Sequence, residues 1–367
     1  MEHLKISLLI SSFVLPFLLS LTIFWVAGKD VSKKIMALGL FNTFFVFLAN
    51  YFYFQKMFGQ YSYIHSLHIA AVLWLFPLIF LYVKSIVGEN IKKNLWHLLP
   101  GVIMGCISAL LFYGLLNQQE RVFYLSNYRT GIEFSALKLK AISVFRMVDV
   151  FLIIAQIVYY SIALIRIPKK YDSVLMQEYS NIENFSINWL YWFNGAFVLV
   201  GILSILFYVV NPFHTDNELF LVLFLFFISA FIWIIGIWSF KQKKPRFQPD
   251  VIHVSTSLLA NAAQNNEDVL VATLLKYFED DRPYLNPELS LTSVCKQVGT
   301  NRTYLSNIIN NRFKMNFNAF VNQYRVKYIL NYQKMNPSAT YPVLMEVGGF
   351  GSVSSLKRAL ERFGNAQ

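Results

Sequence analysis

Residues 65–87 read HSLHIAAVLWLFPLIFLYVKSIV, an apolar run whose one Lys or Arg, Lys84, lies close to its end. A helix of about 20 apolar residues spans the ~30 Å hydrocarbon core of a bilayer at ~1.5 Å per residue. A segment surrounded by lipid must satisfy its own backbone hydrogen bonds, which a helix does. This run therefore predicts a membrane-spanning helix.

Six further apolar stretches of similar length lie on either side of it. The seven expected spans are Leu4–Ala27, Lys34–Phe54, His65–Val87, Leu95–Asn117, Leu139–Ile165, Trp189–Val210 and Leu219–Phe240. The first is too long for a cleaved signal peptide. Composition agrees, because a chain that is 56% hydrophobic, 17% aromatic and only 14% charged is outside the range of soluble proteins. We predict an all-α protein with a seven-helix transmembrane bundle in residues 1–240.

The short loops indicate how the bundle is oriented, because Lys and Arg accumulate on the cytoplasmic side of a membrane. The loops on the side of the C-terminal tail carry 13 Lys and Arg, and the opposite side carries 6. We therefore expect a multi-pass protein of the bacterial cytoplasmic (inner) membrane. Its N-terminus is expected outside the cell and its C-terminal tail in the cytoplasm.

Polar residues inside the fifth expected span are candidates for sensing a signal. Arg146 and Asp149 are three residues apart and share a helix face, and Gln156 follows further along the same span. Ionisable residues at membrane depth usually face a partner or a water-filled cavity. Two interpretations remain open for them: a functional site, or a salt bridge and interhelical hydrogen bonds that hold the helices together.

Signatures of catalysis are missing from the membrane half of the sequence. It has no Gly-rich phosphate loop, nucleophile elbow or paired-His metalloprotease motif. The two cysteines, Cys106 and Cys295, lie far apart, and the histidines expected on the outer side (His65, His68 and His214) have no metal-ligand spacing. We predict no enzyme activity, no metal and no cofactor.

Positive charge concentrates in the tail, where Lys and Arg number 16 against 9 Asp and Glu from Lys241 onward. Residues 241–266 begin with the basic cluster KQKKPR, which can also contact anionic lipid headgroups. This stretch is interpreted as a basic juxtamembrane linker. It is expected to be the only route by which the membrane part can reach the tail.

Residues 267–367 are expected to form a soluble helical domain with two helix-turn-helix units joined by a long helix. In the first unit a short helix from Leu291 ends at Gly299, and a second helix starts after Asn301. Its apolar stripe leaves polar residues on the opposite face: Arg302, Thr303, Ser306, Asn307 and Asn310. Arg suits guanine and Asn suits adenine, at about 1–3 kcal/mol of discrimination per good contact. The long helix that follows is expected to expose Arg325 and Lys327.

The second unit repeats this arrangement after Pro342, with a turn at Gly348 and Gly349 and a second helix from Ser352 to Phe363. The side chains expected to face outward are Val353, Ser354, Lys357 and Arg358. Residues 291–367 carry ten Lys and Arg and only two acids. That imbalance is typical of a surface that binds the phosphates of double-stranded DNA.

Both units resemble the AraC/XylS-type transcriptional regulators. The stretches that carry the resemblance are TNRTYLSNIIN (300–310), NQYRV (322–326) and GFGSVSSLKRAL (349–360). The resemblance implies that the two recognition helices enter successive major grooves, with base-facing positions at Thr303, Ser306, Asn307, Val353, Ser354 and Arg358. The sequence departs from the family at Leu356 and Leu360, which stand where Phe is usual, and it stops before the family's closing helix. The family has no counterpart for the membrane spans.

We therefore expect a membrane-embedded one-component transcription regulator. A small-molecule or envelope signal would change the packing or pairing of the bundle, with a homodimer as one arrangement, and the DNA-binding domain would respond. The alternative is a transporter or channel whose helix-turn-helix tail is regulatory or degenerate. Charge reversal at Arg146 or Asp149 distinguishes the two, because only a transporter would lose solute uptake.

Overall fold

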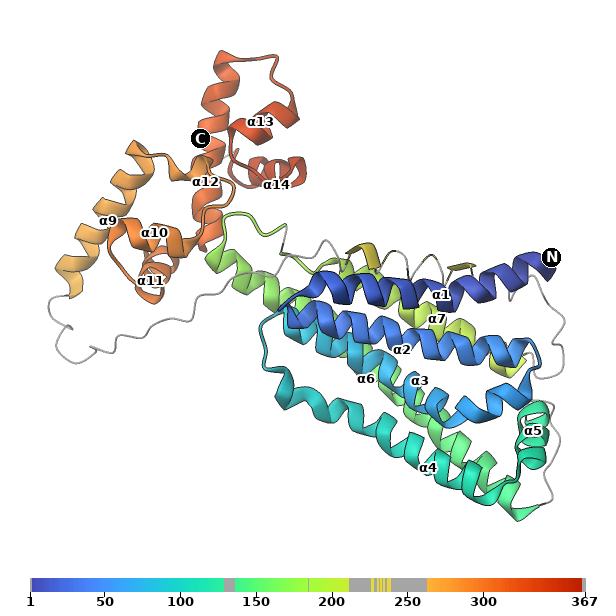
Figure 1. The fold of residues 1–367 in the computed structure, drawn as a ribbon. Helices are drawn as coiled ribbons and strands as arrows, with labels where there is room; N and C mark the ends of the chain where they lie inside the picture. The colour runs from blue at the N-terminus through green and yellow to red at the C-terminus, as the bar shows by residue number, and fades with distance from the viewer. Residues whose placement is uncertain are drawn as a thin grey trace. The chain divides into compact units, whose positions relative to one another are not determined.

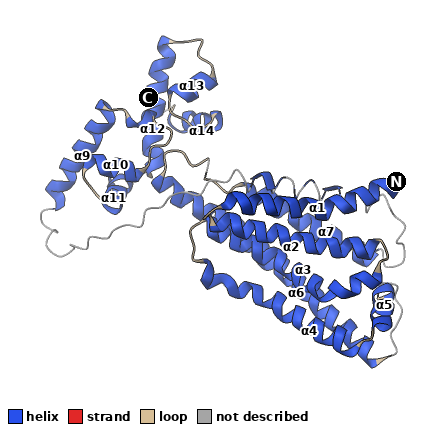
Figure 2. Ribbon diagram, in the orientation of Figure 1, coloured by secondary structure: helices blue, strands red, loops and turns tan. Residues whose placement is uncertain are grey.

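The computed structural model describes residues 2–128, 136–183, 185–210 and 263–364, together with residues 226, 227, 230, 232, 234 and 236–238. All regular secondary structure in these residues is helical (Figure 2). The chain divides into two compact units. Unit 1 comprises Met1–Arg166 and Asn188–Gln242, and unit 2 comprises Ile167–Ile187 and Lys243–Gln367.

Most helices of unit 1 are long (Figure 1). They are α1 (Glu2–Ala27), α2 (Val31–Phe54), α3 (Phe58–Ile86), the 3₁₀ helix η1 (Ile91–Leu98), α4 (Leu99–Leu115), α5 (Gln118–Asn127), the first part of α6 (Leu137–Glu178), and α7 (Trp189–Val210). In the described part of the chain, five segments are long and apolar enough to cross a membrane: Ile6–Ala27, Val31–Phe54, Phe58–Ile86, Ile91–Leu115 and Leu137–Glu178. The N-terminal half thus has the helices of a multi-pass membrane protein.

The two remaining expected spans have different outcomes. Helix α7 begins and ends where the sixth was predicted, at Trp189 and Val210. The seventh, Leu219–Phe240, lies mostly outside the described residues, and those of its positions that are described are helical.

Helix α3 is the central helix of unit 1. In its most apolar window 61% of residues are buried, against 17–33% in the corresponding windows of the other four segments. It packs on α2 on one side and on α4 on another. Two glycines of α4 permit the close approach, since an added Cβ would lie 2.4 Å from Nε1 of Trp74 at Gly101 and 2.9 Å from Cβ of Ala70 at Gly105. Small residues serve this purpose in membrane helix pairs generally.

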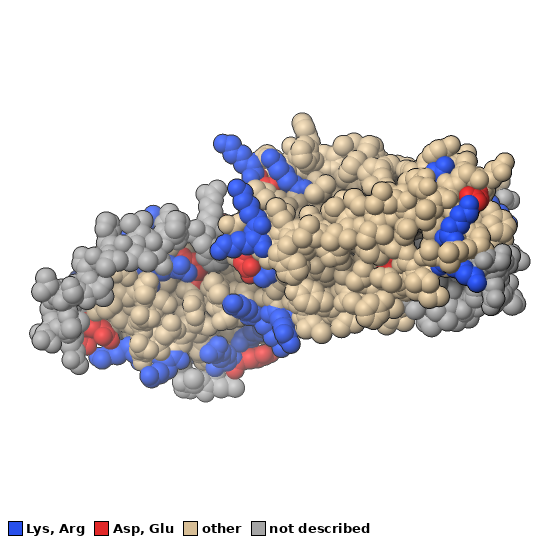
Figure 3. Space-filling view, turned by 90° about the horizontal axis from the view of Figure 1, so that it is seen from below, with Lys and Arg blue, Asp and Glu red and all other residues tan. Residues whose placement is uncertain are grey.

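The outer surface of unit 1 is apolar. Large side chains stand almost fully exposed, among them Trp25 at 87%, Trp192 at 86% and Leu137 at 84%. The face drawn in Figure 3 is almost free of charged side chains over this unit, and those it shows gather toward the ends of the helices. Such a surface is stable against lipid rather than against water.

Helix α6 continues beyond the predicted end of the fifth span at Ile165 and runs to Glu178. At ~1.5 Å per residue its 42 residues reach about 63 Å, roughly twice the ~30 Å hydrocarbon core. About half of α6 therefore extends beyond a bilayer. The sequence prediction ended the helix where the basic residues begin, but Tyr171 and Leu175 continue a buried stripe on the extension.

Unit 2 is also helical, and four of its short helices pack in two consecutive pairs. Its helices are the last part of α6, α9 (Ala263–Asp280), the 3₁₀ helix η2 (Pro283–Leu285), α10 (Leu291–Val298), α11 (Arg302–Arg312), α12 (Phe317–Met335), α13 (Tyr341–Val347) and α14 (Val353–Phe363). One core gathers apolar residues of α9, α10, α11 and the start of α12. A second core joins the later part of α12 to α13 and α14. Helix α12 thus belongs to both cores and joins the two pairs (Figure 1).

Residues 167–187 pack against this helical domain, although they lie between two expected spans. Tyr179 forms an isolated antiparallel bridge with Ser290, and the backbone N–H of Ser180 donates to the carbonyl of Leu289 at 3.0 Å. The expectation that residues 241–266 are the only route from the membrane part to the tail was wrong. A contact between two segments more than 100 residues apart in the sequence cannot be predicted from a local sequence pattern.

Candidate functional site

The first candidate DNA-contacting helix, α11, is positioned by its own turn and cap. Gly299 ends α10 in the left-handed conformation at φ 72°, which suits a residue without a Cβ. The side chain of Asn301 then accepts a hydrogen bond at 2.8 Å from the backbone N–H of Tyr304 and caps α11. Leu305, Ile308 and Ile309 are buried and turn the opposite face of α11 outward.

The predicted contact residues of α11 lie on that outward face. Thr303 and Asn307 are exposed, and Ser306 and Asn310 are half-buried, with the Asn310 amide donating to the Ser306 hydroxyl at 3.4 Å. Arg302 is half-buried and forms an ion pair, described below. The structure thus brings together five polar side chains on one helix face.

The second candidate helix, α14, begins at a capping box. The Ser352 hydroxyl accepts from the backbone N–H of Ser355, and the Ser355 hydroxyl accepts from the backbone N–H of Ser352. Buried Leu356 and Ala359 anchor the helix. Its predicted contact residues face away from that anchor: Ser354, Lys357 and Arg358 are exposed and Val353 is half-buried.

Arg325 of α12 was predicted to be exposed, and that prediction was wrong. The side chain is fully buried, with an exposed fraction of 0%, whereas Lys327 is exposed as predicted. The Arg325 guanidinium donates from Nε to the Tyr284 carbonyl at 2.6 Å and from Nη2 to the Asn286 carbonyl at 2.9 Å. Burial lowers the pKa of Arg325 to about 10, so it is still charged at neutral pH. Helical periodicity places Arg325 at the edge of the apolar face of α12. It does not predict that the backbone carbonyls of Tyr284 and Asn286 bind the guanidinium inside the domain.

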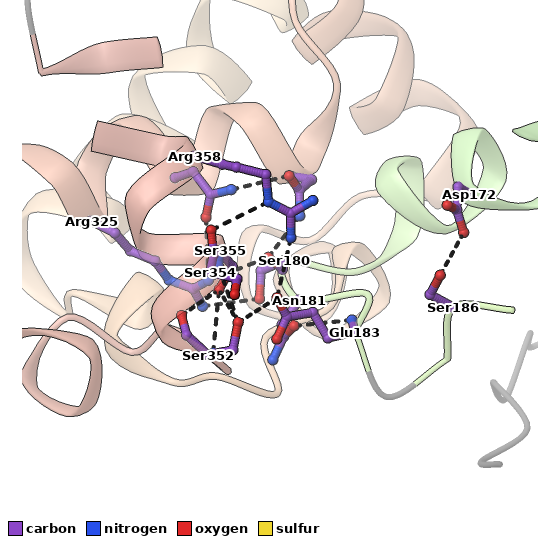
Figure 4. A network of polar contacts seen from close by, with 12 residues as sticks. Asp172, Ser180, Asn181, Glu183, Ser186, Arg325, Ser352, Ser354, Ser355 and Arg358 are labelled. Carbon is purple, nitrogen blue, oxygen red and sulfur yellow. Dashed lines mark hydrogen bonds and ion pairs between the residues drawn. The ribbon is translucent and has the colours of Figure 1, made fainter. Parts of the chain in front are cut away.

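Two acidic residues from outside residues 267–367 contact the candidate helices, one residue for each helix. Oε2 of Glu178 lies 2.5 Å from Nε of Arg302, at the start of α11. Oε1 of Glu183 accepts from the Ser352 hydroxyl at 2.5 Å and lies 3.3 Å from Nη2 of Arg358 on α14 (Figure 4). Sequence reasoning missed these carboxylates, because each lies more than 100 residues from its partner.

A second candidate site is a cavity of about 160 Å³ inside unit 1. Its wall combines aromatic rings with polar groups from five helices, including His65 and His68 of α3, Tyr124 of α5, and Arg146 and Asp149 of α6. The structure therefore brings two of the three predicted sensing candidates to one cavity. Gln156, the third, is half-buried and does not line it.

Polar groups in this cavity are incompletely satisfied. The Arg146 guanidinium lies 3.8 Å from the ring centroid of Tyr128. Oδ1 of Asp149 and Nδ1 of His65 are buried and have no hydrogen-bond partner among the described residues. A buried polar atom without a partner costs about 1–3 kcal/mol, so both atoms favour binding of a water or a polar ligand.

Two buried asparagines of unit 1 form hydrogen bonds between helices. The Asn42 amide on α2 donates to the Ala71 carbonyl on α3 at 2.8 Å, and the Asn194 amide on α7 donates to the Ser161 carbonyl on α6 at 3.2 Å. For these two asparagines the interpretation as interhelical hydrogen bonds is the one that the contacts support.

Comparison with known proteins adds no relative: no family model, no curated protein and no solved structure matches this chain.

Proposed function

We propose that this protein is a membrane-embedded one-component transcription regulator that binds promoter DNA through an AraC-type domain in residues 267–367. The observation that supports this most strongly is the repeated unit of unit 2. In each copy a short helix, a glycine turn and a capped second helix present Arg, Ser, Thr, Asn or Lys outward from a buried apolar anchor. In helix-turn-helix proteins the second helix lies in the major groove with its N-terminal residues on base edges.

In this proposal, some residues of the two recognition helices contact bases and others contact phosphates. Thr303, Ser306 and Asn307 of α11 and Ser354 and Arg358 of α14 contact base edges, and nearby Arg302 and Lys357 neutralise phosphates. Val353 and Asn310 complete the two contact faces. Since α12 belongs to both cores, it sets a fixed separation between the helices. Such a module reads two successive major grooves.

Seven spans are part of the proposal, with the N-terminus outside, the DNA-binding domain in the cytoplasm and the bacterial inner membrane as location. The distribution of Lys and Arg between the loops supports this orientation. A protein held in this way binds only DNA that approaches the membrane.

The signal in this proposal is a small molecule that enters the cavity of unit 1. At about 160 Å³ the cavity is small for a drug-sized ligand, which favours a compact molecule. Asp149 would accept a hydrogen bond from it, and the aromatic wall would contact its apolar part. To act as a signal, the molecule must bind two arrangements of the bundle with different affinities.

The test is DNA binding by the full-length protein in lipid nanodiscs. Random duplexes of about 40 base pairs cover two major grooves roughly 10 base pairs apart, and selection from them yields the preferred sequence. We expect selective binding that weakens as salt rises, loss of selectivity in Asn307→Ala, and weaker binding to all duplexes with a smaller salt dependence in Arg302→Ala. Lys334→Ala is the matched control, because it removes an exposed positive charge of α12 outside the recognition helices.

The same experiment has a clear contrary outcome. Absence of selective duplexes from well-folded protein would contradict the regulator and favour a transporter with a degenerate tail. Solute uptake into vesicles that contain wild-type protein or Asp149→Lys would then test that alternative.

A further inference from the structure

The acidic residues that contact both recognition helices lie in one short stretch, Glu178–Glu183, called here the 178–183 segment. It follows directly on the last turn of α6 and belongs to unit 2 together with the helix-turn-helix pairs. Its two glutamates contact α11 and α14, and the residues between them contact α12. The segment therefore contacts both proposed recognition helices and the helix α12 that joins them.

At α11 the contact is built around a buried carboxylate. Glu178 is 3% exposed. Its Oε1 accepts from the Thr292 hydroxyl at 2.6 Å and from the Thr292 backbone N–H at 3.3 Å, while its Oε2 pairs with Nε of Arg302 at 2.5 Å. A carboxylate held by two hydrogen bonds and an ion pair has a defined position. It lies at the first residue of the recognition helix.

At α14 the contact again lies at the helix N-terminus. Glu183 accepts from the hydroxyl of Ser352, the N-cap residue, and pairs with Arg358 nearly two turns further along (Figure 4). Asn181, two residues before Glu183, packs on Gly351, where an added Cβ would lie 1.7 Å from its Nδ2. The segment thus fits a surface that glycine leaves open.

Between the two carboxylates, Ser180 holds the segment to α12. Its carbonyl accepts from the Asn318 amide at 2.8 Å, and its hydroxyl accepts from Nη2 of Arg325 at 3.0 Å. These are contacts to residues that are not expected to touch DNA. The segment therefore has its own binding site on the module, in addition to its contacts with Arg302 and Arg358.

Helix N-termini favour anions, and they are also where a recognition helix approaches base edges and phosphates. With Glu178 paired to Arg302 and Glu183 paired to Ser352 and Arg358, both helices carry a carboxylate where DNA would bring negative charge. We propose that the 178–183 segment is an intramolecular competitor of DNA that holds the module in a low-affinity state. This inference rests on the proposed function and concerns regulation of the same surface.

The placement of the segment in the chain gives the competition a connection to the membrane. Helix α6 carries Arg146 and Asp149 of the cavity and ends at Glu178. A ligand that changes the position of α6 would also change how the segment meets the module. Because such coupling is reciprocal, DNA binding and docking of the segment weaken each other by the same factor.

The test compares DNA affinity in full-length protein in nanodiscs. Wild type is compared with the double variant Glu178→Gln, Glu183→Gln, with a labelled duplex selected from random sequences by the double variant. Glutamine keeps the shape and one acceptor oxygen, so the fold is retained while both charges are removed. We expect Kd to fall by about tenfold, within the roughly 5–150-fold range of typical coupling between sites. Glu288→Gln is the control, since it removes one charge from an exposed side chain of the same unit.

A second variant releases the segment without removing a charge. Gly351→Ala places a methyl group against Asn181, and Gly351 does not have the left-handed backbone that would strain alanine. It is also expected to lower Kd. Hydrogen exchange provides a direct readout: amides of residues 179–183 should exchange faster in both variants, and in wild type when the duplex is added.

The outcomes separate this inference from the proposed function. Equal Kd for wild type and both variants, with unchanged exchange in residues 179–183 on DNA addition, would overturn the competitor while the regulator stands. If no variant binds any selected duplex, the regulator itself fails, and the competitor fails with it. Tighter binding by Glu288→Gln equal to that of the double variant would show a general charge effect and would also overturn the competitor.

Discussion

Replacing Arg325 by methionine is expected to destabilise the helical domain of unit 2, although the change removes a buried charge. Three short hydrogen bonds are lost, to the carbonyls of Tyr284 and Asn286 and to the hydroxyl of Ser180, at 2.6, 2.9 and 3.0 Å. Hydrogen bonds to a charged group contribute about 1.5–3 kcal/mol each, so the gross loss is roughly 4.5–9 kcal/mol. Relief of the desolvation penalty of the guanidinium offsets several kcal/mol of this. The net cost is about 3 kcal/mol.

The surroundings of the three acceptors support a cost of this size. The Asn286 carbonyl keeps a second donor, the N–H of Leu289 at 3.2 Å, so it stays satisfied without Arg325. Among the described residues no other donor bonds to the Tyr284 carbonyl, so the substitution would leave it buried and unpaired. Arg325→Lys keeps the charge but lacks the planar fork, so we expect it not to restore stability.

Hydrogen exchange of the α12 amides in the full-length protein measures this change. A loss of about 3 kcal/mol accelerates exchange roughly 100-fold, since each 1.4 kcal/mol corresponds to a factor of ten. Lys327→Met on the same helix is the control and should change stability by no more than about 0.5 kcal/mol, because Lys327 is exposed. If Arg325→Met exchanged at the rate of this control, or if Arg325→Lys restored wild-type protection, the role assigned to the guanidinium fork would be refuted.

Two glycine pairs provide further predictions. In urea unfolding of unit 2, Gly349→Ala should lower the free energy of unfolding by at least about 3 kcal/mol and Gly299→Ala by about 1 kcal/mol. Both glycines have positive φ. Only at Gly349 would an added Cβ lie against the backbone, 2.3 Å from the carbonyl oxygen of Leu285. Similar costs would show that backbone strain alone matters. In unit 1, Gly105→Leu should lower the melting temperature in detergent by several degrees, because a Cβ there already lies 2.9 Å from a side chain of α3, whereas Gly114→Leu, with open space, should leave it unchanged. Equal shifts would contradict the close approach of α3 and α4.

Local sequence patterns predicted much of this structure. Apolar length predicted the helices of unit 1, since a helix in lipid needs only its own hydrogen bonds and an apolar surface. Glycines and caps predicted α10, α11 and α14 because they act within one turn of the residue concerned; Gly299 and Asn301 are two examples. The outward positions of the candidate DNA contacts were predicted from the apolar stripe on the opposite face of each helix.

Other features depended on contacts that no local pattern encodes. From the sequence, Arg325 was predicted to be exposed, and no pattern marked Glu178 or Glu183 for a role. Only the tertiary structure pairs the glutamates with α11 and α14 and encloses the guanidinium among carbonyls. Likewise, Arg146 and Asp149 were predicted to share a helix face, but the cavity they line also needs α2, α3, α4 and α5.

The division between the two kinds of information has a physical basis. Helix formation, capping and burial of an apolar stripe depend on residues within a few positions of one another, so the amino-acid sequence by itself determined that this chain is helical and rich in segments long and apolar enough to cross a membrane. The partner of a buried charge is selected by the packing of distant segments, where the desolvation of a carboxylate or guanidinium must be balanced by donors or acceptors in a fixed position. Tertiary structure alone therefore decided which residues face the proposed DNA-binding helices and which complete the cavity.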